Sequence, residues 1–380
     1  MTVLQNYRSA QAYPHNDSPG PSMRYLAMLG SILLLMLTGV VMALAASNPA
    51  SVGQDGSAFS EFGKHATHVT LGIIALLFTV GRDYRLWRRI APLLLAAACL
   101  GLVLVLLFGY SSGGSRRWLD LGLFGLQPSE ITKLALVVSL ASFLDQRRYF
   151  LDRIDRVTLP VLASIAVPCV LIAHQQRDLG TAAIIGSIAL GMMWAAGVPF
   201  RHLGLLLVPS LGAGLFFALA EPFRRGRIIG FFSPAENSLG DGYQVTQGLA
   251  SLSNGGFRGT GLSAGHAQWG WVPEADTDFV FAVVGEQLGF VGAVAVLILL
   301  ATIVLTGFRT AQIAPDVFGS LLAAGISVWF FLQIFVNLGG VVGRLPITGV
   351  TLPFVSSGGT SLIVNAAAAG LLLNIARQSK

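Results

Sequence analysis

The sequence predicts an all-α polytopic integral membrane protein. Of its 380 residues, 54% are hydrophobic and only 11% are charged, and the mean hydropathy is +0.70. This composition lies outside the range of soluble domains and is typical of a chain that crosses a bilayer several times. The 45 glycines fit the same class, because small residues let helices pack closely in lipid.

Apolar runs long enough to cross a membrane predict about ten helices. In chain order they lie near 26–46, 66–81, 90–109, 129–144, 157–173, 180–197, 202–220, 279–305, 317–339 and 356–376. The fourth to sixth runs are short and could extend into their flanks or tilt. Residues 1–22 are polar and contain several prolines, so we expect a disordered tail followed by a single transmembrane domain over 23–380.

Positive charges in the loops predict the orientation. Arginines cluster at 82–89 and 147–156, after the second and fourth runs, and further basic residues follow the sixth and eighth runs and close the chain. With ten spans all of these lie on one side, so both termini are expected in the cytoplasm. The net charge of +6 is then mainly a topology signal, and no arginine-rich strip with interleaved aromatics indicates nucleic acid.

This orientation places polar segments 111–130 and 174–180 outside, together with a large outer loop, 221–278, between the seventh and eighth runs. Long loops of this kind are often functional. Several arginines also lie on this disfavoured side: Arg116, Arg117, Arg177, Arg224, Arg225, Arg227 and Arg344. Guanidinium groups suit phosphate oxygens, so the set predicts an anionic lipid-linked substrate. Any one of them could instead bind lipid headgroups or pair with a carboxylate such as Asp178.

Three carboxylates, Glu274, Asp276 and Asp278, stand directly before the eighth run. A charge at the mouth of an apolar run is costly to place and often functional. Asp278 is the last ionisable group before hydrocarbon, where partial desolvation would raise its pKa toward the range of a general base. The structural alternative is that Thr277 or Asp278 simply caps the helix.

Other polar features carry weaker signals. Glu130 and Lys133 share one helix face at the start of the fourth run, either as an ion pair or as a substrate contact. The glycine-rich stretch 253–261 permits a close approach of the backbone to a ligand, although it is not a P-loop. The last outer loop, 343–360, contains too many prolines and glycines for a helix, so it must be buried in protein or line a cavity.

Five stretches together resemble the SEDS family (shape, elongation, division and sporulation) of bacterial cell-wall polymerases. They are RRWLDLGLFGLQPSEITKLAL at 116–136, RDLGTA at 177–182, GYQVTQGLASLSNGGFRGTGL at 242–262, PEADTDFVFAVVGEQLGFVG at 273–292 and LPITGVTLPFVSSGGTSLIV at 345–364. The segment VTLPFVSSGGTSLIV is more similar to FtsW, the division member, than to RodA, the elongation member. One departure is Asp276, where many relatives carry histidine. A second carboxylate there would raise the pKa of Asp278 or supply a metal ligand.

The resemblance implies a peptidoglycan glycosyltransferase that polymerises lipid II at the outer face of the bacterial cytoplasmic membrane, in division or elongation. The growing glycan on undecaprenyl pyrophosphate would be the donor, and the 4-hydroxyl of lipid II the nucleophile. The family's catalytic aspartate falls on Asp278, as general base. A divalent cation, Mg²⁺ or Mn²⁺, is compatible with this chemistry, with Asp278 and Asp276 as candidate ligands. The substrate-binding candidates are Arg116, Arg117, Gln127, Glu130, Lys133, Asp178, Glu274, Asp276 and Ser356.

The resemblance also implies a partner, a membrane-anchored class B penicillin-binding protein, and other divisome or elongasome membrane proteins. The largest predicted outer loop, 221–278, is smaller than a usual enzyme domain, so we expect a second polypeptide to crosslink the peptides. Gly285 and Gly289 have the GxxxG spacing that suits contact with an anchor helix. The alternative function is a flippase or transporter of the lipid-linked precursor, a class that often shows an internal repeat, which this sequence lacks.

Overall fold

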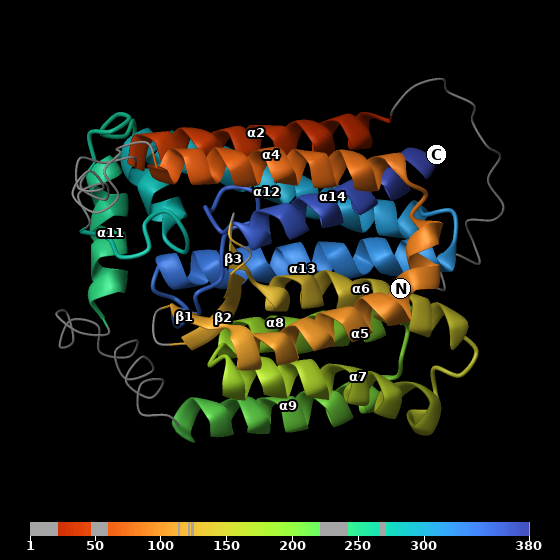
Figure 1. The fold of residues 1–380 in the computed structure, drawn as a ribbon. Helices are drawn as coiled ribbons and strands as arrows, with labels where there is room; N and C mark the ends of the chain where they lie inside the picture. Colours follow the sequence, from red (N-terminus) through yellow and green to blue (C-terminus); the bar gives the residue numbers. More distant parts are fainter. Residues whose placement is uncertain are drawn as a thin grey trace.

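The computed structural model describes residues 22–46, 60–112, 115–120, 122, 125–220, 242–265 and 271–379. Most of them form long helices that lie side by side in one bundle (Figure 1). Two π-helical turns, Ile154–Thr158 and Leu171–Gln175, flank α7. In chain order the long helices are α2 (Met23–Ala46), α4 (Ser60–Gly81), α5 (Arg85–Phe108), α6 (Pro128–Gln146), α7 (Leu159–Val170), α8 (Leu179–Ala196), α9 (Phe200–Ala220), α12 (Val280–Ile313), α13 (Val317–Val341) and α14 (Thr360–Gln378).

The predicted fold class is confirmed. Within the described ranges, nine helices are long and apolar enough to cross a membrane, so the chain is a multi-pass membrane protein. Helix α6 is not one of the nine, because it carries Glu130, Lys133 and Asp145. It nevertheless packs between α5, α8 and α13 inside the bundle. The count of ten spans stays a prediction.

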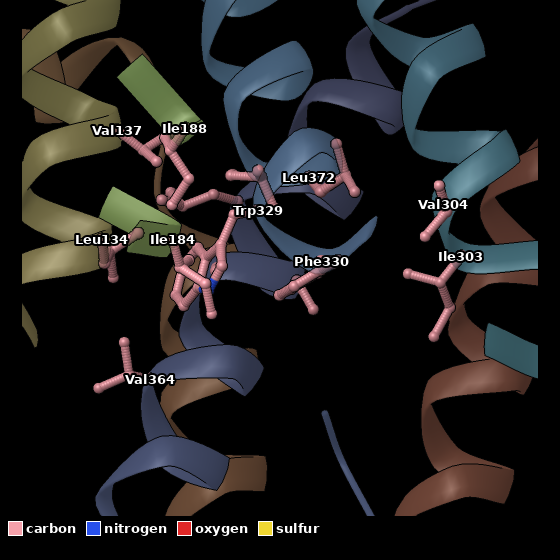
Figure 2. Close-up of a cluster of buried hydrophobic side chains, with 14 of the residues drawn as sticks. Leu134, Val137, Ile184, Ile188, Ile303, Val304, Trp329, Phe330, Val364 and Leu372 are labelled. Atoms are coloured by element: carbon pink, nitrogen blue, oxygen red, sulfur yellow. The ribbon is translucent and has the colours of Figure 1, made fainter. Parts of the chain in front are cut away.

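The core lies where α6, α8 and α13 meet. Trp329 of α13 is buried among Leu134 and Val137 of α6 and Ile184 and Ile188 of α8 (Figure 2). Helices α8, α13 and α14 bury most of their length, whereas α9 exposes most of its apolar side chains. A helix that is apolar all round needs an apolar environment, so the exposed faces of the outer helices are suited to lipid.

The chain between α5 and α6 forms a small antiparallel sheet that the sequence analysis did not expect. Its strands are β1 (Tyr110–Ser112), β2 (Ser115–Asp120) and β3 (Gly125–Leu126), with β2 in the middle. The predicted outer loop 221–278 contains another unexpected element, helix α11 (Tyr243–Gly255). Residues 221–241 and 266–270 of that loop, and residues 1–21 of the predicted tail, lie outside the described residues.

Helix α12 is interrupted at Gly289 (φ 68°, ψ −168°). In a continuous helix the amides of Phe290 and Val291 would bond to the carbonyls of Glu286 and Gln287. The segment after α11 pairs with these four groups instead, so the backbone at the kink stays hydrogen-bonded. The bonds are Phe290 N to Gly256 O (2.9 Å), Val291 N to Phe257 O (3.4 Å), Thr260 N to Glu286 O (2.9 Å) and Gly261 N to Gln287 O (3.1 Å).

Glycines make this backbone contact possible. A Cβ on Gly255 would clash with Gly285 O, and a Cβ on Gly259 would clash with Gln287 O. The sequence analysis expected the glycine-rich stretch 253–261 to approach a ligand. In the structure this stretch approaches the backbone of α12 instead. Helix α11 and the residues that follow it to Gly261, here called the α11 segment, cover Gly285 and Gly289. The predicted contact of these two glycines with a partner helix is therefore wrong.

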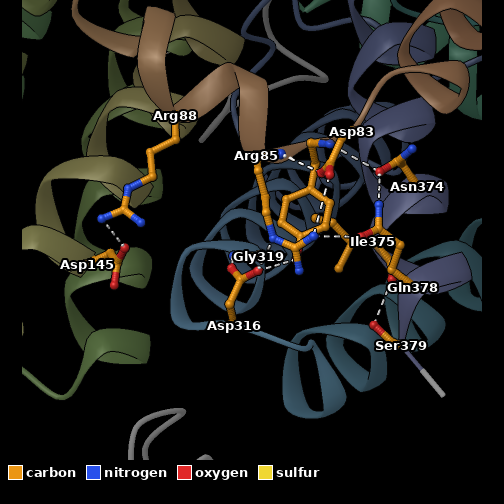
Figure 3. Close-up of polar contacts among 11 residues, drawn as sticks. Asp83, Arg85, Arg88, Asp145, Asp316, Gly319, Asn374, Ile375, Gln378 and Ser379 are labelled. Carbon is orange, nitrogen blue, oxygen red and sulfur yellow. Dashed lines mark hydrogen bonds and ion pairs between the residues drawn. The ribbon is translucent and has the colours of Figure 1, made fainter.

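At the opposite end of the bundle, the α4–α5 turn is fastened to the α12–α13 turn and to α14 (Figures 1 and 3). The Tyr84 hydroxyl donates to Asp316, and Arg85 Nε donates to the same carboxylate at 2.9 Å. Asn374 accepts from the Tyr84 amide (3.2 Å) and donates to Val80 O (2.7 Å). Burial raises the pKa of the Tyr84 phenol, and the hydrogen bond to Asp316 raises it further.

Candidate active site

Several long helices begin at the end of the bundle that carries the sheet. Helices α6, α8, α12 and α14 all begin there. The Gln127 amide donates to Thr360 Oγ1 (3.0 Å), which joins the starts of α6 and α14. Gly180 at the start of α8 packs against Thr348, because a Cβ there would lie 2.7 Å from Thr348 Cβ. Helix N-termini carry partial positive charge, so this end of the bundle favours anions.

Asp278 and Arg117 face one small space at this end. A Cβ built on Gly349 (φ 73°) would lie 3.5 Å from Asp278 Oδ2 and 3.9 Å from Arg117 Nη1. Asp278 is partly buried and lies two residues before the start of α12. The N-cap of that helix is Phe279, with no side-chain cap hydrogen bond, so the capping interpretation of Thr277 or Asp278 is wrong. The structure therefore brings together the predicted base and a predicted phosphate ligand.

Arg117 is held by the turn before α8. Its Nε donates to Gln176 O (3.0 Å) and its Nη2 to Arg177 O (3.0 Å). Its Nη1 lies 3.6 Å from Asp178 Oδ2. Asp178 is buried and also caps α8 by accepting from the Thr181 amide (2.9 Å). The pairing with Asp178 considered from the sequence is thus present, and it fixes the guanidinium in place.

Arg116 has a different position. Successive side chains of a strand point to opposite faces, and Arg116 on β2 is exposed, whereas the Arg117 side chain is only 25% exposed. The structure therefore does not bring Arg116 to the space beside Asp278 in the way that it brings Arg117.

The backbone of the Asp276–Asp278 segment is fastened at three successive carbonyls. Two of the donors come from the loop at 343–360, and the third comes from α13. Because each residue in the segment is tied, the Asp278 side chain starts from a fixed backbone. The bonds are Ser357 N to Asp276 O (2.8 Å), Ser356 Oγ to Thr277 O (2.6 Å) and Asn337 Nδ2 to Asp278 O (2.8 Å).

Two predicted substrate ligands make contacts within the chain. Ser356 is buried, and its hydroxyl also accepts from the Leu352 amide (2.7 Å), so here it supports the site from behind. Glu274 is exposed and has a left-handed backbone (φ 54°). Its Oε2 accepts from Thr277 Oγ1 at 2.7 Å.

Glu130 and Lys133 form a buried ion pair, with Lys133 Nζ 2.7 Å from Glu130 Oε1. The ammonium also lies 3.4 Å from Gln333 Oε1. Gln333 Nε2 in turn donates to Thr351 O (2.9 Å) in the loop at 343–360. This chain of contacts favours the ion-pair interpretation and links α6 to the loop beside Asp278.

Sequence reasoning missed Gln333 and Asn337. Both side chains are buried in α13, four residues apart on one face. A usable signal was present, because polar side chains inside a membrane helix are rare and commonly functional.

The part of the chain that the structure describes provides no preformed metal site. Among the described residues, no group of three or more His, Cys, Asp or Glu side chains is arranged to hold a metal ion. Mg²⁺ is often bound through one or two carboxylates together with substrate phosphates and water. Asp278, with Asp276 two residues away, fits that type of shared site and not a closed protein site.

Comparisons with known proteins agree with this arrangement. The family model described as "Cell cycle protein", which covers FtsW, RodA and SpoVE, matches residues 25–380. Stage V sporulation protein E of Bacillus subtilis is 36% identical over 350 residues, 92% of this chain and 95% of that protein. A probable peptidoglycan glycosyltransferase FtsW of Nitrosomonas europaea is 36% identical over 371 residues, covering 95% of each.

Solved structures show the same fold. One chain comes from a study of how a peptidoglycan synthase complex coordinates polymerization and crosslinking. It matches with a TM-score of 0.78 and 26% identity, covering 95% of this chain and 99% of that one. The crystal structure of the rod shape determining protein RodA of Thermus thermophilus matches with a TM-score of 0.67 and 26% identity, covering 96% and 99%. The chain therefore belongs to the FtsW/RodA/SpoVE family of membrane proteins.

Proposed function

We propose that this chain is a peptidoglycan glycosyltransferase that polymerises lipid II at the outer face of the bacterial cytoplasmic membrane, with both termini in the cytoplasm. The observation that carries the proposal is that the Asp278 carboxylate and the Arg117 guanidinium face one space, at the end of the bundle where α6, α8, α12 and α14 begin. Relatives named peptidoglycan glycosyltransferase FtsW support the same activity.

In the proposed reaction Asp278 takes the proton from the 4-hydroxyl of lipid II. The hydroxyl oxygen then bonds to the anomeric carbon of the growing glycan, and the bond from that carbon to the pyrophosphate oxygen breaks. Undecaprenyl pyrophosphate leaves with both electrons of that bond. Arg117 and the helix N-termini stabilise the negative charge that develops on the pyrophosphate. A divalent cation shared between Asp278, Asp276 and the pyrophosphate would add charge neutralisation.

The proposed partner is a membrane-anchored transpeptidase of the class B penicillin-binding type. The solved neighbour studied for polymerization and crosslinking supports an assembly of this kind. The partner's anchor helix must use a surface other than Gly285 and Gly289, which the α11 segment covers. Co-purification from native membranes under mild detergent tests the assembly, and recovery of the chain alone in fully active form would contradict it.

The decisive experiment is glycan synthesis by the chain and its partner reconstituted with purified lipid II. Asp278→Asn keeps the size of the side chain and removes its basicity. We expect polymerisation to fall by about two to four orders of magnitude, the usual contribution of a general base. Asp276→Asn is the matched control and should have a smaller effect. A well-expressed Asp278→Asn protein with near-normal glycan synthesis would refute the assignment, and lipid translocation without glycan would favour a flippase.

A further inference from the structure

We infer that Asn337 is a positioning residue for glycan polymerisation, because its side-chain amide ties the backbone of Asp278 to the last outer loop. The inference rests on the proposed function of Asp278 and adds a residue that no sequence motif indicated. Asn337 lies on α13 and is 5% exposed, so it acts from behind the site.

One amide nitrogen makes both ties. Asn337 Nδ2 donates to Asp278 O at 2.8 Å and to Val350 O at 2.7 Å. An amide nitrogen carries two hydrogens, so these bonds use its full donor capacity. Val350 follows Gly349, whose Cβ position lies 3.5 Å from Asp278 Oδ2. Asn337 therefore sets the spacing between the Asp278 backbone and the loop that borders its carboxylate.

The start of α12 makes this tie necessary. In a regular helix the Ala282 amide would bond to the carbonyl four residues earlier, at Asp278. Here it bonds to Phe279 O at 2.9 Å, and the Asp278 carbonyl is bonded by Asn337. The first helical turn therefore leaves the Asp278 carbonyl to be bonded by α13, while the N–H of the same peptide group, that of Phe279, donates to Glu274 O at 3.1 Å.

The side-chain oxygen of Asn337 argues against a purely stabilising role for this residue. Asn337 Oδ1 is buried and has no hydrogen-bond partner among the described residues. An unsatisfied buried polar atom costs stability, and an apolar residue of similar shape would avoid that cost. The two donated bonds are what the asparagine supplies, and one of them lies at the proposed base.

Gln333 completes the arrangement one helical turn away. It donates to Thr351 O at 2.9 Å, so α13 holds two successive carbonyls of the loop, those of Val350 and Thr351. Loss of Asn337 alone would leave Thr351 tied but release the Asp278 carbonyl, so the Asp278 side chain could shift relative to the loop. A misplacement of about 1 Å in a reacting group can cost about 100-fold in rate.

The test uses the full chain with its partner in liposomes and compares Asn337→Leu with Asn374→Leu. Asn374 is the matched control, because it is also buried and also donates to a backbone carbonyl, Val80 O, but at the opposite end of the bundle. We expect kcat of Asn337→Leu to fall by about 10- to 100-fold. Its KM for lipid II should change much less, and kcat of Asn374→Leu should stay within a small factor of the parent value.

A second comparison separates positioning from general damage. In an Asp278→Asn background, Asn337→Leu should cause little further loss, because the group that it positions is already gone. If Asn337→Leu folds poorly, Asn337→Ser keeps one donor and should show a smaller loss with the same non-additivity. An unchanged kcat in the Asn337 variants, or a full additional loss in the Asp278→Asn background, would overturn the inference. Activity of Asp278→Asn alone reports separately on the proposed function.

Discussion

Arg117 shows how one residue can be structural and functional at once. Its guanidinium donates to two backbone carbonyls through Nε and Nη2, while Nη1 lies between Asp178 and the space beside Asp278. A lysine carries the same charge on a single nitrogen, so it cannot hold both carbonyls and still reach that space. The planar fork is therefore the property that the position requires.

We expect Arg117→Lys to lower polymerisation at limiting lipid II by about tenfold, the effect of losing one charge-assisted hydrogen bond. Activity should recover only partly at high lipid II, because Arg117 contributes to binding of the pyrophosphate and also stabilises the charge that develops on it. The measurement is the initial rate as a function of lipid II concentration. Arg116→Lys on the exposed neighbour is the control, and an Arg117 variant with unchanged lipid II dependence would show that the arginine is only structural.

Among the individual site residues, the sequence predicted those whose charge and position along the chain are informative by themselves. Asp278 is a charge at the mouth of an apolar run, Arg117 a cation on the disfavoured side, and Glu130 and Lys133 an opposite pair on one helix face. Asn337 was not predictable in the same way. Its importance comes from one nitrogen meeting two carbonyls, at Asp278 and Val350, that belong to different segments.

Among the elements, the kink in α12 and the segment after α11 behave as one unit. Their backbones exchange the hydrogen bonds that a continuous helix would make internally, and glycines on both sides allow the approach. Gly259 has a left-handed backbone (φ 82°), so a side chain there would be both strained and obstructed.

Gly259→Ala should destabilise the protein, because the added Cβ meets the backbone of α12 at Gln287 and Gly289. We expect a loss of about 2 kcal/mol or more, seen as a lower melting temperature in detergent. Gly204→Ala in α9 is the control. A Cβ at Gly204 meets nothing within 4 Å, so this variant should melt at or slightly above the parent temperature. Equal melting of the two variants would contradict the contact.

The Tyr84–Asp316 bond predicts a pH dependence. The phenol has an ordinary pKa of 10.0, and in the folded protein its pKa is raised. The folded state thus holds the proton more tightly, so the stability contributed by Tyr84 is fully present below pH 10 and declines as the pH rises further. Tyr84→Phe should be less stable than the parent by about 1 kcal/mol at neutral pH.

The difference in melting temperature between parent and Tyr84→Phe should therefore shrink above pH 10. Both proteins are melted across the same pH series in detergent, so titration of their shared groups cancels from the comparison. A difference that stays constant up to pH 11 would show that the hydroxyl proton does not contribute in this way.

Element boundaries were only partly predictable. Apolar runs located the long helices because lipid-facing and core-facing positions are both apolar. The same pattern could not reveal α11, which is too short and too polar to form an apolar run, or the sheet, whose strands are short. It also missed the continuation of α12 to Ile313, because polar residues near its end do not interrupt a helix.

The whole molecule has two different ends. One carries Asp278, Arg117 and the N-termini of α6, α8, α12 and α14, and the other is fastened by Tyr84, Asp316 and Asn374 (Figures 1 and 3). The arginines at 82–89 and 147–156, which predicted a cytoplasmic side, lie at the end that carries Tyr84 and Asp316. The chemistry and the loop charges therefore separate along the long axis of the bundle.

Cysteine labelling in intact cells tests this orientation. In a background with Cys99 and Cys169 replaced by alanine, Asn254→Cys on α11 should react with a membrane-impermeant maleimide. Arg89→Cys at the other end should stay protected until the membrane is opened. Both positions are exposed in the fold, so access depends on the side of the membrane. Protection of Asn254→Cys with labelling of Arg89→Cys would reverse the topology.

The hydrogen bonds between the α11 segment and α12 also limit which substitutions and which chimeric proteins can fold. Gly255, Gly259, Gly285 and Gly289 come from two stretches of sequence, yet each leaves room for backbone or side chain of the other stretch. A substitution that adds bulk on one side must be matched by a change on the other. A chimera that takes the α11 segment from a relative should therefore function only when the whole of residues 243–291 is exchanged.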